Sequence, residues 1–199
     1  LKKKEFNLVN IKINEWTILL IPSYFLFDIV DYAHIFLVIV ALLSFFEFLH
    51  EKELSFLKFE DFKDSLGKLI ICWPLILLTS LFSMLLFNNL KEQEIVTKLK
   101  TDLSISLLVS SIIIAPILEE IFFRKFVYRI IKKKLGFLMS AIIASLMFSV
   151  IHYNLYSFGT LFLLGIICTI KYENTGRIIH PILIHSFFNS TMVLFSLIR

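Results

Sequence analysis

Long apolar runs alternate with short charged stretches along the whole chain. A helix needs about 20 residues to cross the roughly 30 Å hydrocarbon core of a bilayer, and most of these runs approach that length. The first run is short, so it is tilted, interfacial or paired with the second as a hairpin. The pattern predicts an all-α polytopic transmembrane helical bundle with about seven spans (between six and eight), near residues 16–27, 32–49, 69–87, 103–131, 135–152, 156–170 and 178–198.

The composition agrees with a membrane location. Hydrophobic residues make up 58% of the 199 residues and charged residues 18%, against about 25% charged in an ordinary soluble domain. This balance excludes a soluble cytosolic enzyme, a disordered chain and a disulfide-rich secreted module. We expect residues 1–199 to form one integral membrane domain with the lipid bilayer as a partner. The Lys- and Phe-rich, Ala-poor composition indicates a bacterial plasma membrane.

The basic residues orient the predicted spans. The net charge is +4, but the Lys residues lie between apolar runs, so we expect no nucleic-acid partner. With a cytoplasmic N-terminus and seven crossings, 15 of the 20 Lys and Arg residues lie inside and four outside, as the positive-inside rule requires. The stretch 50–68 mixes both charge signs with Leu and Phe, which predicts a short amphipathic surface helix.

A few polar side chains interrupt the last four spans. Placing an ionisable side chain at the centre of a span costs about 2.5–3.5 kcal/mol on insertion scales, so such residues are candidates for function. The candidates are Glu119, Glu120, Arg124, His152, His185 and Asn189.

The stretch 115–129 carries two carboxylates and an arginine. Glu120 and Arg124 are four residues apart, so they face each other on a helix and can neutralise each other. Glu119 points about 100° away and has no equivalent partner, which leaves a carboxylate suited to general-base chemistry. Pro116 removes a backbone hydrogen bond and can kink the helix nearby. The alternative is that the helix ends at the membrane–water interface, where water solvates these charged side chains.

Two further pairs share the four-residue spacing. Phe148 precedes His152, and His185 precedes Asn189, so each pair occupies one helical face. The alternatives are an interfacial histidine and hydrogen bonding between spans. At about 1.5 Å per residue, the polar groups of all three stretches reach similar depths inside the membrane. We therefore expect a carboxylate, two imidazoles and a carboxamide to converge at one buried level.

The order Glu-Glu-x-x-x-Arg, Phe-x-x-x-His and His-x-x-x-Asn resembles the CPBP family of intramembrane proteases. Its members include CAAX-processing endopeptidases and Abi-type bacterial proteins of bacteriocin processing and self-immunity. The motifs are EEIFFR at 119–124, FSVIH at 148–152 and HSFFN at 185–189. The resemblance covers about 105–195, within a motif-bearing core at about 103–199.

The resemblance implies a glutamate-type endopeptidase. Glu119 would activate water, and His152 would hold and polarise that water. His185 and Asn189 would stabilise the oxyanion. Glu120, Arg124 and Phe148 would be structural or orienting residues, and no cofactor would be needed.

Other functions remain open at this point. Zinc bound by Glu119, His152 and His185 is the alternative within the enzyme class, although the H-E-x-x-H motif is absent. The chain could also be a non-catalytic self-immunity or partner-binding protein, or a transporter with these charges on a proton path. The expected substrate is a peptide or a membrane protein, without a choice between a prenylated CaaX protein, a peptide precursor and another membrane protein.

Overall fold

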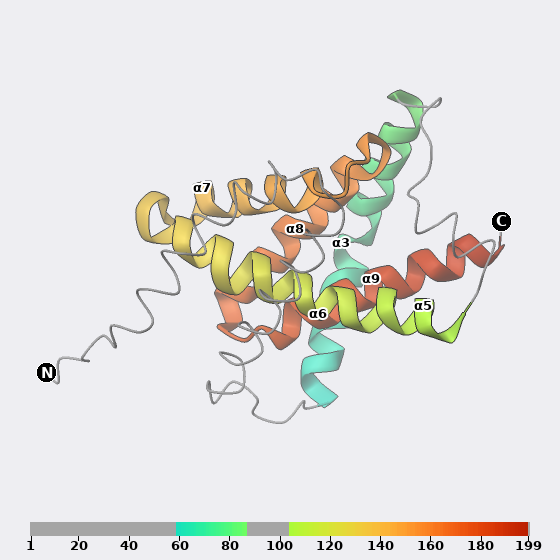
Figure 1. The fold of residues 1–199 in the computed structure, drawn as a ribbon, viewed down its shortest axis with the longest axis horizontal. Coiled ribbons are helices and arrows are strands. Elements are labelled where there is room, and N and C mark those ends of the chain that lie inside the picture. Colours follow the sequence, from blue (N-terminus) through green and yellow to red (C-terminus); the bar gives the residue numbers. More distant parts are fainter. Residues whose placement is uncertain (1–58, 87–103, 199) are drawn as a thin grey trace, which may run out of the picture.

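A computed structural model describes residues 59–86 and 104–198. Every regular element in these two ranges is helical (Figure 1), which confirms the all-α prediction for them. The elements are α3 (Phe59–Leu86), α5 (Ile105–Val109), η2 (Ser110–Ile114), α6 (Ala115–Glu120), η3 (Ile121–Tyr128), α7 (Arg129–Val150), α8 (Leu155–Thr175) and α9 (Ile179–Ile198).

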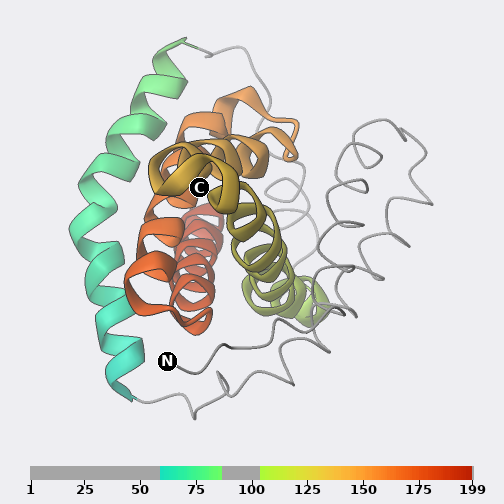
Figure 2. The same ribbon diagram turned by 90° about the vertical axis from the view of Figure 1, so that its left-hand side faces the viewer.

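The helices form three layers. Figure 2 shows α3 along one flank, with α8 and α9 between it and the chain from α5 to α7. Helix α3 packs on both α8 and α9, while α7 packs on α8 and α6 on α9. The motif-bearing helices therefore meet in the interior, on the side of α8 and α9 away from α3.

The chain from 105 to 135 is continuously helical but not regularly α-helical. Two π-helical segments, η2 and η3, lie on either side of α6. At the end of η2 the N–H of Ala115 donates to the carbonyl oxygen of Ser110, five residues back. Pro116 follows at once and lacks an N–H, so the regular ladder is already interrupted here. The disturbance expected around Pro116 is therefore present, as a π-helical turn.

Helix α7 contains a sharp break. Gly136 has φ 73° and ψ −176°, a backbone conformation that glycine adopts at little cost and other residues rarely adopt. In Figure 1 the ribbon reverses direction at its left edge, where this break lies. The apolar stretch Ile105–Val150 is thus a helical hairpin. The predicted boundary between the runs 103–131 and 135–152 is confirmed to within a few residues.

Helix α3 begins earlier than the sequence predicted. Its 28 residues run on from Phe59 through Pro74 to Leu86, so residues 59–68 are not a separate surface helix. The prediction of a separate surface helix was wrong for these residues, because the charged turns and the apolar run belong to one continuous α-helix. Large apolar side chains remain exposed on its outer side, as in a lipid-facing helix. They include Ile70, Ile71, Leu78 and Leu85.

The described residues are those of an integral membrane protein. Three stretches are long and apolar enough to cross a bilayer, and Ile179–Phe195 is a shorter apolar helix. These three are Phe59–Ser83, Ile105–Val150 and Leu155–Thr175. The predicted runs at 16–27 and 32–49 and the N-terminal orientation lie outside the described ranges. The count of seven spans therefore stays a prediction.

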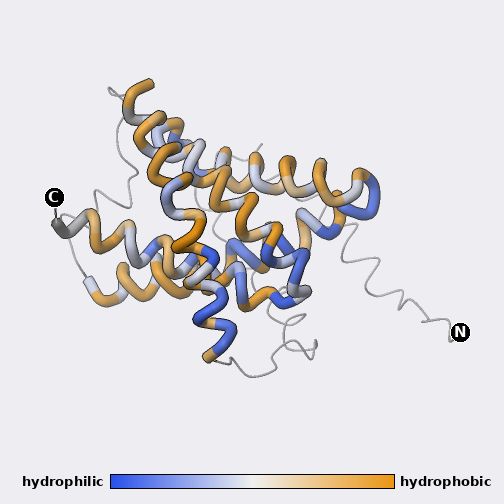
Figure 3. Tube along the Cα trace, turned by 180° about the vertical axis from the view of Figure 1, so that it is seen from behind, coloured by the Kyte–Doolittle hydropathy of each residue, from blue (hydrophilic) through white to orange (hydrophobic). Residues whose placement is uncertain are grey.

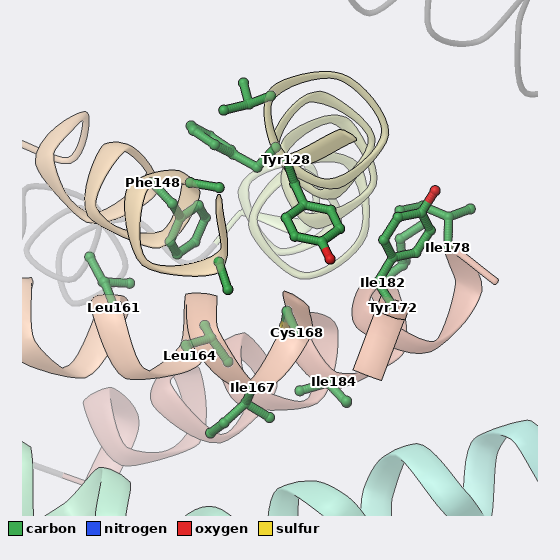
Figure 4. Close-up of a cluster of buried hydrophobic side chains, with 14 of the residues drawn as sticks. Tyr128, Phe148, Leu161, Leu164, Ile167, Cys168, Tyr172, Ile178, Ile182 and Ile184 are labelled. Carbon is green, nitrogen blue, oxygen red and sulfur yellow. The ribbon is translucent and has the colours of Figure 1, made fainter. Parts of the chain in front are cut away.

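The core lies where η3, α7, α8 and α9 meet (Figure 4). Phe148, Leu164, Cys168 and Ile184 are fully buried there. Helices α7 and α8 approach closely at one point, because a Cβ atom on Gly165 would lie only 2.9 Å from the Cβ atom of Ser145. A glycine is required for this contact, which brings the backbone of α8 within reach of the polar groups on η3.

Candidate active site

A buried ion pair anchors the site. Arg124 Nε lies 2.9 Å from Glu120 Oε2, and both side chains are completely buried. Arg124 Nη2 also donates to the carbonyl oxygen of Gly165 on α8, at 3.1 Å. The predicted pairing of Glu120 with Arg124 is confirmed. The sequence did not predict the Gly165 contact, although a glycine within an apolar helix is a signal for close helix packing.

Glu120 also holds the first histidine. Its Oε1 atom lies 2.9 Å from His185 Nδ1, and the imidazole is buried. An ionised carboxylate only accepts hydrogen bonds, so we assign the Nδ1 hydrogen to His185. The other ring nitrogen, Nε2, then faces Glu119 Oε2 at 3.9 Å.

The second histidine is fixed by the backbone of its own helix. His152 Nδ1 lies 2.7 Å from the carbonyl oxygen of Phe148, one turn earlier. Because a carbonyl only accepts, Nδ1 carries the hydrogen here too. His152 Nε2 points to Glu119 Oε2 at 3.8 Å. Both imidazoles thus turn the same type of nitrogen toward one carboxylate.

Glu119 stands between the two imidazoles. Its Oε2 atom is buried and has no hydrogen-bond partner, since both Nε2 atoms lie beyond hydrogen-bonding distance. The side chain as a whole is 27% exposed, and that of His152 is 22% exposed. The carboxylate is therefore reachable from one side, while Glu120, Arg124 and His185 close the other. The distance of nearly 4 Å between Glu119 Oε2 and each Nε2 atom suits a water molecule that bridges them.

The Phe148 ring packs against three members of the site. Its centroid lies 5.1 Å from that of His152 and 5.5 Å from that of His185. The guanidinium carbon of Arg124 lies 5.0 Å from the same centroid. A ring in this position restricts both imidazoles and attracts the cation. The predicted orienting role of Phe148 agrees with these contacts, and a test of that role would need a variant.

Asn189 lies one turn beyond His185 on α9. Its amide nitrogen donates to the carbonyl oxygen of Ser111 in η2, at 2.8 Å. This is the hydrogen bond between helices that the sequence left open as an alternative. A carboxamide has a second N–H, so the role of Asn189 at an oxyanion stays a prediction.

The side chains that the structure describes form no preformed metal site. No three His, Cys, Asp or Glu residues in these ranges are arranged to hold an ion. The Nδ1 atoms of His152 and His185 are engaged, which leaves only their Nε2 atoms and Glu119. The choice between zinc and water activation by Glu119 without a metal stays a prediction.

A second polar cluster, the His180 cluster, ties α3 to α8 and α9. Arg177 Nη1 donates to Asp61 Oδ1 at 2.6 Å, and His180 Nε2 lies 3.5 Å from the same oxygen. Ser65 Oγ lies 3.0 Å from His180 Nδ1. His180 is only 4% exposed, because α3 covers it. The cluster comprises Asp61, Asp64, Ser65, Lys171, Arg177 and His180.

The three motifs therefore meet as the sequence predicted. The Nε2 atoms of His152 and His185 each lie within 4 Å of Glu119 Oε2, and Glu120 and Arg124 support them. The sequence missed Gly165 and the His180 cluster, which depend on contacts between distant helices. The catalytic roles themselves stay predictions.

Comparison with known proteins agrees with these motifs. Residues 101–191 match the family described as type II CAAX prenyl endopeptidase Rce1-like. The chain is 32% identical over 91 residues to a Bacillus subtilis (strain 168) protein named "Putative membrane peptidase YdiL". The match covers 46% of this chain and 37% of that relative. No solved structure matches. Residues 101–191 are thus similar to the Rce1-like CAAX endopeptidases, in agreement with the resemblance that the three motifs carry.

Proposed function

We propose that the protein is an intramembrane endopeptidase of the glutamate type. It would act on a peptide or a membrane-associated protein, in a bacterial plasma membrane. One observation carries this proposal: an unpartnered carboxylate oxygen on Glu119 faces the free nitrogens of two oriented histidines. This arrangement suits the binding and deprotonation of a water molecule. The family match and the membrane peptidase relative support the same class of reaction.

The proposed reaction needs only water and the peptide. Water bound between Glu119 and His152 Nε2 attacks the carbonyl carbon, and its proton passes to Glu119. A C–O bond forms and the carbonyl oxygen becomes an oxyanion. The C–N bond then breaks, and the proton held by Glu119 passes to the leaving nitrogen. The products are a new carboxyl group and a new amine.

His185 would stabilise the oxyanion together with Asn189. Its Nδ1 hydrogen is engaged with Glu120, so Nε2 donates a hydrogen bond only when the imidazole is protonated. Glu120 orients the ring of His185 through this contact, while Arg124 holds Glu120 in place. In this proposal Glu120, Arg124 and Phe148 act through the histidines as positioning residues.

The test is the change Glu119→Gln in the purified protein, with quenched fluorescent peptides as the probe. The variant keeps the shape of the side chain and removes the base. Hydrolysis should fall about 10²-fold or more, with normal membrane yield. The matched control is Glu60→Gln, at an exposed position in the first turn of α3, which should keep full activity. A biological activity that survives Glu119→Gln at normal yield would instead identify a binding or self-immunity protein.

Chelation separates the glutamate mechanism from the zinc alternative. We propose that Glu119 alone activates the water, so activity should persist in strong chelators. Loss of activity on chelation, with recovery on adding zinc, would assign the site to Glu119, His152 and His185 as metal ligands. Adding zinc back to the chelated His152→Ala variant would then show weakened zinc binding.

A further inference from the structure

Helix α7 is closed by an unusual residue directly after His152. The N–H of Tyr153 donates to the carbonyl oxygen of Val150 at 3.0 Å, and Tyr153 adopts φ 49°. Many helices end in this left-handed conformation, and glycine normally occupies the position because a side chain is strained there. Within the described ranges, Tyr153 is the only residue other than glycine with a positive φ.

The end of α8 shows the usual solution in the same chain. Gly176 adopts φ 66°, and its N–H donates to the carbonyl oxygen of Tyr172 at 2.8 Å. The break in α7 likewise uses a glycine, Gly136. A glycine at position 153 would therefore close α7 without strain, so the geometry of the helix end does not explain the tyrosine.

Packing does not explain the tyrosine either. Tyr153 is 76% exposed, so few of its atoms are covered and burial of its ring offsets little of the backbone strain. A large side chain that is both strained and exposed indicates a role outside the fold, because such strain is typical of functional sites.

Tyr153 directly follows the histidine that the proposed function assigns to the catalytic water. Consecutive Cα atoms lie about 3.8 Å apart, and an extended peptide advances about 3.3 Å per residue. A group one residue away from His152 can therefore reach a substrate side chain beside the scissile bond. Glu119 and His152 are themselves partly exposed, so a substrate can approach this part of the site.

We propose that Tyr153 is a specificity residue that binds a bulky apolar side chain beside the scissile bond. This inference rests on the proposed function and extends it to a residue outside the three motifs. A tyrosine ring offers a large apolar surface with only two side-chain torsions to order, which suits Leu or Phe better than Gly or Ala. Glycine at this position would give the more stable protein, and tyrosine the stronger binding of substrate.

A structural role for Tyr153 makes different predictions. Tyrosine also occurs at membrane–water interfaces, where its ring anchors a helix. An anchor would act on membrane insertion and stability, and it would not discriminate between substrates. The change Tyr153→Gly removes the ring and the strain together, so it separates the two roles.

Kinetics and melting curves in detergent are measured for the parent protein, Tyr153→Gly and Tyr153→Phe. The probes are two quenched fluorescent peptides that differ only in their two central residues, which are Leu in one (the Leu peptide) and Gly in the other (the Gly peptide). The matched control is Phe82→Ala, because Phe82 is an aromatic residue of α3 that is 61% exposed. Figure 3 shows that α3 is mainly hydrophobic beyond its charged start, as expected of a helix that faces lipid.

The expected change is a loss of substrate binding without a loss of stability. For the Leu peptide, Tyr153→Gly should raise KM about tenfold with little change in kcat, because the ring binds substrate and transition state alike. The preference for the Leu peptide over the Gly peptide, as a ratio of kcat/KM, should fall by a similar factor. Tyr153→Phe and Phe82→Ala should behave as the parent does, and Tyr153→Gly should melt no lower.

Two results of the kinetic experiment overturn the inference. The first is an unchanged KM and an unchanged preference in Tyr153→Gly. If the melting temperature and the membrane yield fall at the same time, the tyrosine is a membrane anchor. The second is an equal loss of preference in Phe82→Ala, which would make the effect one of exposed aromatic rings in general.

A binding measurement makes the test independent of the chemistry. Fluorescence anisotropy gives the affinity of the labelled Leu peptide for Glu119→Gln, with and without Tyr153→Gly. The affinity should fall about tenfold in the double variant, and equal affinities overturn the inference. If the parent protein hydrolyses neither peptide, the proposed function is contradicted, while the anisotropy still decides whether Tyr153 binds the peptide.

Discussion

The residues that the structure describes contain two clusters in which histidine meets carboxylates, and the clusters differ in how their carboxylates are paired. In the His180 cluster, Asp61 accepts from Arg177 and Asp64 pairs with Lys171. In the site, Glu120 is paired with Arg124, but Glu119 Oε2 has no hydrogen-bond partner. Both clusters join three helices and both lie near the same helix, α9.

This difference distinguishes a structural cluster from a candidate site. A buried polar group without a partner costs about 1–3 kcal/mol, so folding alone gives no reason to retain one. In the His180 cluster, Asp61 and Asp64 each have a cationic partner, so neither carboxylate carries such a cost, and the cluster can serve to hold helices together. The combination of histidine and carboxylate is therefore a weak signal, and the unpaired carboxylate is the informative part.

The largest effect we expect comes from Arg124→Ala. This change leaves Glu120 buried beside His185 without its cation, and breaking such a buried pair costs about 3–5 kcal/mol. The variant should accumulate poorly and melt at a clearly lower temperature in detergent. Arg177→Ala is the matched change in the His180 cluster, where the arginine is 26% exposed, and its loss of stability should be smaller. Equal losses would remove the distinction between the two clusters.

A comparison of the two histidines should separate chemistry from stability. His152→Ala removes the group that holds the water, so hydrolysis should fall about 10²-fold while yield stays normal. His180→Ala removes contacts to Asp61 and Ser65 and should lower the melting temperature with little change in kcat. Activity measurements and melting curves on both variants decide the point. The reverse assignment of losses would make the His180 cluster the functional one.

Gly165→Ala should disturb the support of the site. The new Cβ atom would lie 2.9 Å from the Cβ atom of Ser145, which forces α7 and α8 apart. Such overpacking costs about 1–3 kcal/mol, and it moves the carbonyl that binds Arg124. Gly159→Ala is a matched control on the same helix, because its nearest neighbour is Ser83 Oγ at 3.6 Å. The control should melt no lower than the parent protein.

The smallest effect belongs to Asp64→Asn. Its side chain is 55% exposed where it meets Lys171, and exposed ion pairs contribute about 0.2–1 kcal/mol. Salt should weaken the pair further, so the variant and the parent should have converging melting temperatures at high ionic strength. A large loss that salt does not reduce would show that Asp64 matters as much to the His180 cluster as Asp61.

The sequence predicted those features that depend on spacing within one helix. The pair Glu120–Arg124 follows from a four-residue separation, and the break near Gly136 follows from a charged interruption between apolar runs. The shared depth of the motifs followed from counting residues along spans. In contrast, the ring nitrogen that faces Glu119 depends on hydrogen bonds from Phe148 and Glu120, which no spacing reveals. The burial of His180 under α3 depends on packing between helices more than 100 residues apart.

The two π-helical segments have a consequence for how this site could change over time. A π-helical turn takes in about one residue more than an α-helical turn, as a one-residue insertion would. Each residue of an α-helix advances the angular position by about 100°. The direction in which Glu119 and Glu120 point around the helix axis is therefore offset by the π-helical turns. It does not follow from the regular spacing of the residues before Ser110 or after Tyr128. Deletion of one residue within η2, or within residues 125–128 of η3, would turn the carboxylates away from both imidazoles, with every letter of the three motifs still in place.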